Sequence, residues 1–181
     1  DGLILLNESQ VADFKILYFN SDGNPSSLCG NGSRCAFAFA NELNVSKKEG
    51  IFEAYDGIHS ACLLSNKMVC LKMNDINKIK KSNKSLFINT GSPHHLEFVT
   101  DLSVIDVKKE GAKLRYSSNY ARNGSNINFV EKINSKTFSL RTYERGVEDE
   151  TLSCGTGAVA AGIGAHFFGL TKHQSLNVKT L

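Results

Sequence analysis

The chain has 181 residues, of which 41% are hydrophobic and 22% are charged. This composition is typical of a folded globular protein with one medium domain or two small ones, and it argues against disorder. The formal net charge of +3 comes from 21 basic and 18 acidic residues, and basic residues cluster only over 78–84. A charge this mild and dispersed argues against nucleic acid as a partner.

Neither a membrane segment nor a disulfide framework is indicated. The stretch 158–170 is shorter than a bilayer span and contains His166, and the N-terminus lacks the basic-then-apolar pattern of a signal peptide. The five cysteines form an odd set without CxxC spacing, which argues against paired disulfides and against a zinc ribbon. We therefore expect a cytoplasmic protein with free thiols and without a metal.

Both ends of the chain fall inside patterned segments. The chain begins with Asp1 and runs at once into the apolar residues 3–6, and it stops within the alternating residues 176–181. We expect further sequence at both ends.

The first half of the chain predicts one strand, one helix and two hairpins. A strand over 14–19 is followed by a helix after Gly30, and the segments 51–55, 58–64 and 68–73 form two successive β-hairpins around good turn residues. The helix has an apolar stripe at positions i, i+3, i+4 and i+7. This stripe consists of Ala36, Phe39, Ala40 and Leu43.

The second half repeats this sheet-rich character. Polar residues over 75–85 predict a surface crossing between an N-terminal domain over 1–74 and a C-terminal domain over 86–181. In the second domain we expect a short helix near 104–109 and a longer helix after Gly155. The strands are expected over 86–90, 95–100, 127–133, 137–143 and 176–181, and the stripe of the longer helix consists of Ala158, Ala161, Ala165 and Phe168.

The two main helices also carry small or apolar residues on their other faces. We therefore expect each helix to be surrounded by sheet. The fold class is mixed α and β (α+β), with two similar domains that each wrap a rolled, barrel-like sheet around a central helix.

An internal repeat marks the starts of both helices. Residues 18–32 read YFNSDGNPSSLCGNG and residues 143–157 read YERGVEDETLSCGTG. In each, a Tyr ends a predicted strand, and Cys-Gly-x-Gly opens an Ala-rich helix eleven residues later. The same offset of 125 residues relates both segments, so we interpret them as a duplicated module.

The repeat places a thiol at the start of each helix. There Cys29 and Cys154 lie at the positive end of the helix dipole, which favours the thiolate and allows a thiol to act as a base. The amides of the next residues suit an anionic ligand, as in other helix-start sites. These residues are Gly30, Asn31, Gly155 and Thr156. Two such modules facing one ligand would allow a proton to leave one face of a carbon and return to the other.

Other reactive residue types have simpler interpretations. We expect Cys35, Cys62 and Cys70 to be small buried hydrophobic side chains. The histidines in Pro93-His94-His95 are more often solvated loop residues, and Glu144-Arg145 is also compatible with a surface ion pair.

These residues carry a resemblance to the diaminopimelate epimerase family. The segment Cys29 to Cys35 resembles the family's first cysteine motif, and Glu144-Arg145-Gly146 together with 150–158 resembles the second. The resemblance covers essentially the whole chain. It implies two similar α/β domains with the active site between them, a homodimer, and a cofactor-independent isomerase that interconverts LL- and meso-diaminopimelate for lysine and cell-wall synthesis.

The resemblance also implies roles for individual residues. Cys29 and Cys154 would be the two acid/base thiols, and His94 would help to set their protonation together with Glu144. Arg145 suits a substrate carboxylate because its guanidinium is a fork of donors. The residues implied in substrate binding are Asn20, Gly30, Asn31, Asn126, Glu144, Arg145, Gly155 and Thr156.

The chain departs from the family pattern at Ser92, where the family often has Asn, and at Gly2, where it often has Gln. Proline and hydroxyproline racemases share the two-thiol architecture, but Asn31 and the lead-in 150–153 argue against that family. A non-catalytic relative that binds a ligand is a further alternative.

Overall fold

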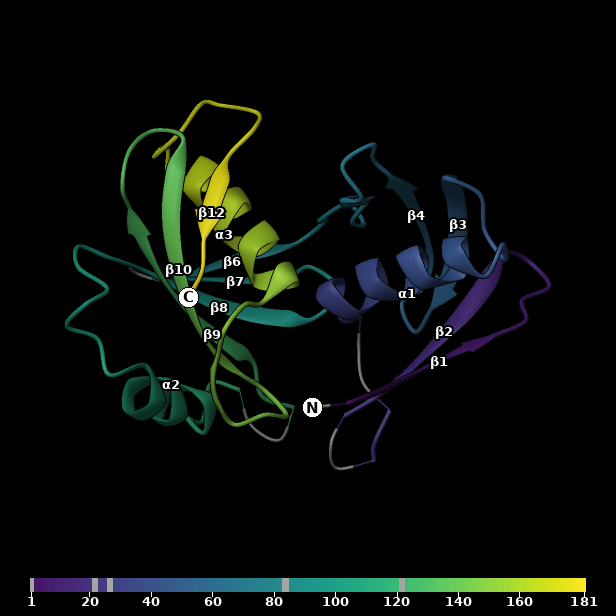
Figure 1. Cartoon of the computed structure of the whole chain (residues 1–181). Helices are drawn as coiled ribbons and strands as arrows, with labels where there is room; N and C mark the ends of the chain where they lie inside the picture. Colours follow the sequence, from purple (N-terminus) through teal and green to yellow (C-terminus); the bar gives the residue numbers. More distant parts are fainter. Residues whose placement is uncertain (1, 21–22, 26–27, 83–84, 121–122) are drawn as a thin grey trace. The chain divides into compact units, whose positions relative to one another are not determined.

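The computed structural model describes residues 2–20, 23–25, 28–82, 85–120 and 123–181. The chain divides into two compact units, Asp1–Asp75 and Ile76–Leu181 (Figure 1). Both units contain helices and strands, which confirms the mixed α and β class expected from the sequence. Within the described residues, no helix is both long and apolar enough to cross a membrane.

The first unit is a five-stranded sheet with one helix packed on it. The strands follow the order β1-β2-β3-β4-β5, and only the β2–β3 pair is parallel. The β3-β4-β5 arrangement confirms the two predicted hairpins. The elements are β1 (Leu3–Asn7), β2 (Phe14–Phe19), α1 (Gly30–Glu42), β3 (Glu49–Ala54), β4 (Gly57–Leu63) and β5 (Val69–Leu71).

The predicted buried stripe of α1 is only half correct. Ala36 and Ala40 are buried, but Phe39 and Leu43 are 51% and 52% exposed, and Phe37 is fully buried instead. Phe37 packs near Phe14 of β2, with ring centroids 6.3 Å apart. The helix therefore presents a different face to the sheet, and the expectation that sheet surrounds α1 is wrong for its exposed face.

The second unit is a larger sheet with helices on both faces. Its strands follow the order β11-β10-β9-β8-β7-β6, and β12 pairs with β10. The pairs β8–β9 and β10–β12 are parallel, and β9–β10 is antiparallel. The elements are β6 (Ile79–Ser82), β7 (Ser85–Asn89), β8 (Pro93–Val99), α2 (Val107–Arg115), β9 (Asn126–Lys132), β10 (Thr137–Glu144), β11 (Asp149–Thr151), α3 (Gly155–Phe167) and β12 (Asn177–Lys179).

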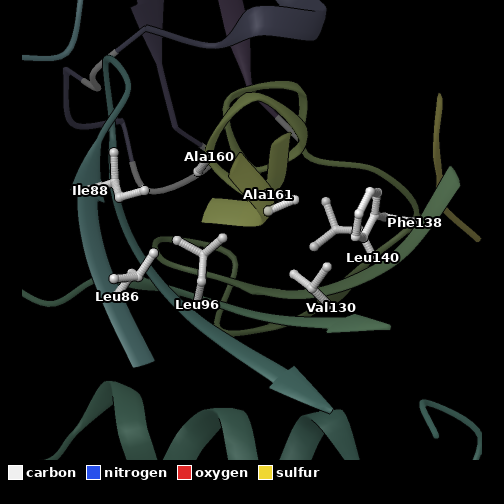
Figure 2. Close-up of a cluster of buried hydrophobic side chains, with 9 residues drawn as sticks. Leu86, Ile88, Leu96, Val130, Phe138, Leu140, Ala160 and Ala161 are labelled. Carbon is white, nitrogen blue, oxygen red and sulfur yellow. The ribbon is translucent and has the colours of Figure 1, made fainter. Parts of the chain in front are cut away.

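The two faces of this sheet have separate hydrophobic cores. On one face, Ala160, Ala161 and Ala165 of α3 pack against Leu96 and Val130 and their neighbours (Figure 2). On the other face, α2 packs through Val107 against a second cluster on β9 and β10. Because side chains alternate along a strand, every second residue of β8 and β9 faces the α3 side. Ala161 and Ala165 confirm the predicted stripe of α3.

Four elements differ from the sequence expectation, and one of them is β1 (Leu3–Asn7), which was not expected as a strand. Strand β6 lies inside the predicted polar crossing, of which residues 83 and 84 lie outside the described residues, and β11 was not expected. Helix α2 begins later than expected because Asp106 caps it by accepting a hydrogen bond from the Lys109 amide at 3.0 Å. It continues through Gly111, where a Cβ would lie 2.4 Å from Tyr143 Cβ, so the glycine allows α2 to approach the sheet.

Candidate active site

The two helix starts have the same local structure. Cys29 is the N-cap of α1 with φ −98° and ψ 104°, and Cys154 is the N-cap of α3 with φ −125° and ψ 108°. Both helices have 13 residues. Tyr18 lies in β2 and Tyr143 in β10. The strand and the helix predicted from the repeat are therefore confirmed in both units. Residues 21, 22, 26 and 27 of the first connecting segment lie outside the described residues, and the second connecting segment contains β11.

The second glycine of each Cys-Gly-x-Gly motif lies in a close approach to a strand side chain. A Cβ on Gly32 would lie 2.5 Å from Ile4 Cδ1, and a Cβ on Gly157 would lie 2.6 Å from Asn128 Oδ1. Each added Cβ would also lie 3.3 Å from the sulfur of its own motif's cysteine, Cys29 or Cys154. The glycines therefore let the first helical turn approach both the sheet and the thiol.

Cys29 is half-buried and lies against a cavity of the first unit. The Gly32 amide donates a hydrogen bond of 3.3 Å to Cys29 Sγ, so the sulfur caps the helix. The cavity has a volume of about 300 Å³ and is lined mainly by apolar side chains, among them Ile4 and Leu28. The ion pair between Lys15 and Glu53 also lines it.

Cys154 is buried, and a polar chain of side chains reaches it. Its sulfur lies 3.5 Å from Thr156 Oγ1, which in turn lies 2.8 Å from His94 Nε2. His94 is completely buried, and burial lowers its pKa to about 3, with a further lowering by the positive charge of Arg145. His94 is therefore neutral at physiological pH and acts through hydrogen bonds.

The amide of Asn126 connects two segments of the second unit. Its Nδ2 donates to Ser92 Oγ at 2.9 Å and to the Pro93 carbonyl at 3.0 Å, and its Oδ1 accepts from the Arg145 amide at 2.9 Å. Ser92, the departure from the family pattern, is therefore a buried acceptor that fixes Asn126. This contact holds the backbone of the Glu144-Arg145 turn against the sheet.

The Glu144-Arg145 turn carries two charged residues of the second motif. Burial raises the pKa of Glu144, although Thr151 Oγ1 donates a hydrogen bond of 2.8 Å to its carboxylate. Arg145 Nη1 donates to the Asn123 carbonyl at 2.9 Å. Burial lowers the pKa of Arg145, and the nearby Arg115 lowers it further. Both side chains are therefore partly buried and hydrogen-bonded to other residues, so the interpretation as a simple surface ion pair does not describe them.

Arg115 and Glu148 also contact this turn. Arg115 Nη2 lies 2.9 Å from Glu148 Oε1, which also accepts from the Gly146 amide at 3.1 Å. Gly146 has φ 93°, a left-handed conformation that glycine adopts without strain.

The predicted site residues of the first unit lie close to Cys29 in sequence. Asn20 follows β2, is half-buried, and its carbonyl accepts a hydrogen bond of 2.9 Å from the Gly23 amide. Asn31 lies in the first turn of α1, where its Oδ1 accepts from Arg34. At Gly2 a Cβ would come within 2.5 Å of the Phe19 carbonyl oxygen, so this departure from the family matches a close approach of the chain to β2.

Several sequence expectations require correction. His94 and His95 lie on β8 and are buried, not solvated, because strand pairing carries them into the sheet. Cys35 and Cys70 are exposed and Cys62 is half-buried, so the expectation of buried cysteines is wrong for the first two. No disulfide links any of the five cysteines, all of which lie within the described residues.

Sequence reasoning missed Asn128, which is completely buried and contacts His94. The signal was the spacing Asn126-Ile127-Asn128, because alternate residues of a strand share a face. Among the described residues, no group of three or more His, Cys, Asp or Glu side chains is placed to hold a metal ion.

Comparisons with known proteins identify relatives of the whole chain. Residues 86–181 match the family model described as diaminopimelate epimerase. The chain is 51% identical over 178 residues to the diaminopimelate epimerase of Flavobacterium psychrophilum, covering 98% of this chain and 70% of that protein. It is 39% identical over 191 residues to that of Aquifex aeolicus, covering 99% of this chain and 68% of that protein.

Solved structures with low sequence identity share the fold. A hydroxyproline epimerase from Agrobacterium vitis superposes with a TM-score of 0.70 at 16% identity, over 96% of this chain and 62% of that one. A phenazine biosynthesis protein of the PhzF family from Bacillus anthracis superposes with a TM-score of 0.67 at 17% identity, over 92% of this chain and 65% of that one. The sequence matches, by contrast, are specific, and the chain belongs to the diaminopimelate epimerase family.

Proposed function

We propose that the protein interconverts LL- and meso-diaminopimelate by exchanging the α-proton between two thiols, Cys29 and Cys154. Membership of the family supports the substrate and the isomerase chemistry. The observation that carries the mechanism is the repeated helix start, in which a cysteine caps each of two 13-residue helices. No bound cofactor is required, because thiols can exchange the proton themselves.

The proton transfer is balanced without a redox step. The thiolate of one cysteine takes the α-proton of the substrate and becomes a thiol. The thiol of the other cysteine gives its proton to the opposite face of the same carbon and becomes a thiolate. Inversion in the other direction exchanges the two roles, so each cysteine serves as acid for one isomer and as base for the other. The proposal requires that both thiols reach one substrate carbon.

Electrostatics would support both the thiolates and the substrate anion. The amides at each helix start and the helix dipole stabilise negative charge. On the α1 side these amides belong to Gly30 and Asn31, and on the α3 side to Gly155 and Thr156. We assign Arg145 to a substrate carboxylate, with Glu144, Asn20 and Asn126 as further substrate contacts. Fixed dipoles in a water-poor site act more strongly on the developing carbanion than water does.

Deuterium incorporation tests the reaction directly. The protein is incubated in deuterated water with LL-diaminopimelate or with L-proline, and the α-deuterium content and stereochemistry of the amino acid are measured. We expect inversion and deuterium uptake with diaminopimelate only. Replacing Cys29 or Cys154 by Ala should lower turnover by at least a thousandfold. The control variant Cys35→Ala, at an exposed thiol of α1, should keep the wild-type turnover.

Each other outcome has a clear meaning. Turnover of proline alone would assign the protein to the racemase chemistry of its distant structural relatives. Binding of diaminopimelate without deuterium uptake would identify a non-catalytic relative. Full inversion by either single Ala variant would refute the two-thiol mechanism.

Oxidation tests whether the two thiols reach one carbon. Hydrogen peroxide accepts two electrons and two protons from a pair of close thiols, which leaves a disulfide and water. We expect reversible inactivation together with a peptide that links Cys29 to Cys154. Inactivation without that peptide in a mass-spectrometric map would contradict the shared site.

Two further properties are proposals: a cytoplasmic location, expected from the sequence pattern, and a homodimer, implied by the family resemblance. A cytoplasmic location would keep both thiols reduced. We also propose a homodimer, which analytical ultracentrifugation of the protein would test.

A further inference from the structure

A chain of buried hydrogen bonds connects the sheet of the second unit to Cys154. It runs from Thr142 on β10 through Asn128 on β9 and His94 on β8 to Thr156 on α3. Thr142, Asn128, His94 and Thr156 are each at most 4% exposed. The family resemblance gave a role to His94 and Thr156, but it gave none to Asn128 or Thr142.

The orientation of the Asn128 amide is determined by its neighbours. Its Nδ2 donates to the His95 carbonyl at 2.9 Å, and its Oδ1 accepts from Thr142 Oγ1 at 3.0 Å. In the flipped orientation the amide oxygen would face the His95 carbonyl, so two acceptors would oppose each other. The NH₂ group must therefore be the one that faces His94 Nδ1, at 3.0 Å.

This orientation fixes the proton on His94. Because Nδ1 accepts from Asn128, the single proton of the neutral ring must lie on Nε2. Nε2 then donates to Thr156 Oγ1, 2.8 Å away. Having accepted this bond, the Thr156 hydroxyl can direct its own hydrogen to Cys154 Sγ, 3.5 Å away. Burial and the positive charge of Arg145 both keep the ring neutral, so the direction of the chain is stable.

We propose that Asn128 is a positioning residue that holds His94 as the Nε2–H tautomer, so that Thr156 donates a hydrogen bond to the Cys154 thiolate. The inference that this thiolate is needed rests on the proposed function. His94 takes up no proton in this arrangement. It accepts a hydrogen bond from Asn128 at Nδ1 and therefore donates one to Thr156 from Nε2. Cys29 is stabilised differently, by the Gly32 amide, so the effect is confined to one of the two thiols.

Nitrogen NMR of the whole protein tests the tautomer without any substitution. We expect the ¹⁵N signals of His94 to show a protonated Nε2 and an unprotonated Nδ1 from pH 5 to pH 9. In Asn128→Asp the carboxylate can only accept, so the proton should move to Nδ1. A wild-type ring that is protonated at Nδ1, or that carries both protons at pH 7, would overturn the proposal.

Alkylation by iodoacetamide tests the consequence for the thiol. Asn128→Asp should lower the modification rate of Cys154 at pH 7 by about tenfold, since a thiolate that loses a hydrogen bond binds its proton more tightly. Cys29 in the same molecule is the internal control, and its rate should not change. Thr156→Val should reproduce the slower reaction of Cys154, and Thr156→Ser should restore it; this pair keeps the test open if Asn128→Asp does not fold.

The outcomes separate this inference from the proposed function. In an active enzyme, Asn128→Asp should lower kcat while KM stays within about twofold, because the substrate contacts are unchanged. Equal alkylation of Cys154 in wild type, Asn128→Asp and Thr156→Val would refute the inference even if the wild type inverts diaminopimelate. A wild type that fails to invert it but shows the expected tautomer and alkylation rates would refute only the proposed function.

Discussion

The helix starts at Cys29 and Cys154 have similar backbone conformations but differ in what surrounds the sulfur. Cys29 is half-buried, accepts a hydrogen bond from its own helix and lies beside a largely apolar cavity. Cys154 is buried and lies at the end of a polar chain that crosses three strands. The repeated motif thus places each thiol, whereas strand residues outside the motif set the surroundings of each one. In the proposed mechanism, the two thiols can then be tuned separately.

One buried histidine of each unit, His59 and His94, also differs from the other in its surroundings. His59 of the first unit is hydrogen-bonded to Asp56 at 2.9 Å, which raises its pKa despite its burial. His94 of the second unit has only neutral hydrogen-bond partners, and its pKa falls to about 3. These two histidines should therefore change the stability of their units in opposite directions as the pH falls.

The largest predicted effect is this difference in acid stability. The unfolded state binds a proton at His94 below about pH 6.5, whereas the folded state does so only near pH 3, so stability is lost as the pH falls. Between pH 6.5 and 4.5 we expect a loss of about 2–3 kcal/mol from His94. His59, with its raised pKa, contributes stability that is present below pH 6.5 and lost as the pH rises through its folded value.

Hydrogen exchange of core amides, measured for each unit between pH 4.5 and pH 8 and corrected for intrinsic rates, reports this difference. The amides of β8 and β9 should lose protection in acid, and His94→Gln should remove that dependence. Equal acid sensitivity of the β3 and β4 amides would contradict the contrast.

The next prediction concerns the second glycine of each motif. Gly157→Ala should destabilise the protein by about 2 kcal/mol, because the new methyl meets the buried and fully bonded Asn128 amide. Gly32→Ala should change stability by less than about 1 kcal/mol, because it meets the end of the Ile4 side chain, which can rotate, and because Ala favours helix. Urea unfolding at pH 7 measures both, and equal costs would show that the two sites are equally rigid.

A smaller effect is expected on ligand affinity when Arg145 is replaced. Arg145→Lys should weaken binding of an unreactive diaminopimelate analogue by about tenfold, because an ammonium group lacks the planar fork that holds a carboxylate. Isothermal titration calorimetry measures the affinity. Arg141→Lys is the matched control, since Arg141 lies on β10, the strand that Arg145 follows, but pairs with Glu150. If the two variants bind alike, Arg145 does not hold the substrate.

The smallest effect is a difference in thiol accessibility. Without substrate, iodoacetamide should modify Cys29 about three- to fivefold faster than Cys154 at pH 7, because only Cys154 is buried. Peptide mapping of partially modified protein gives both rates. Faster modification of Cys154 would show that the hydrogen bonds to its thiolate outweigh its burial.

The sequence by itself determined most of the elements and the positions of both thiols. The 125-residue offset identified two strand-loop-helix modules, and the structure confirms a cysteine N-cap at each. Alternating residues predicted the β3-β4-β5 hairpins, because side-chain periodicity and turn residues are local properties of the chain. Boundaries were less certain at α2, where the Asp106 cap moved the start.

Only the tertiary structure decided what surrounds the thiols. The fully buried face of α1 follows Phe37, not Phe39, because ring packing against β2 overrides a stripe that the sequence leaves ambiguous. His94 resembled a loop residue until strand pairing buried it between neighbours from distant segments. Asn128 lies 34 residues from His94 and 14 from Thr142, so their hydrogen bonds arise only when β8, β9 and β10 pair. Local pattern places a thiol at a helix start, but long-range pairing determines its hydrogen-bond partners.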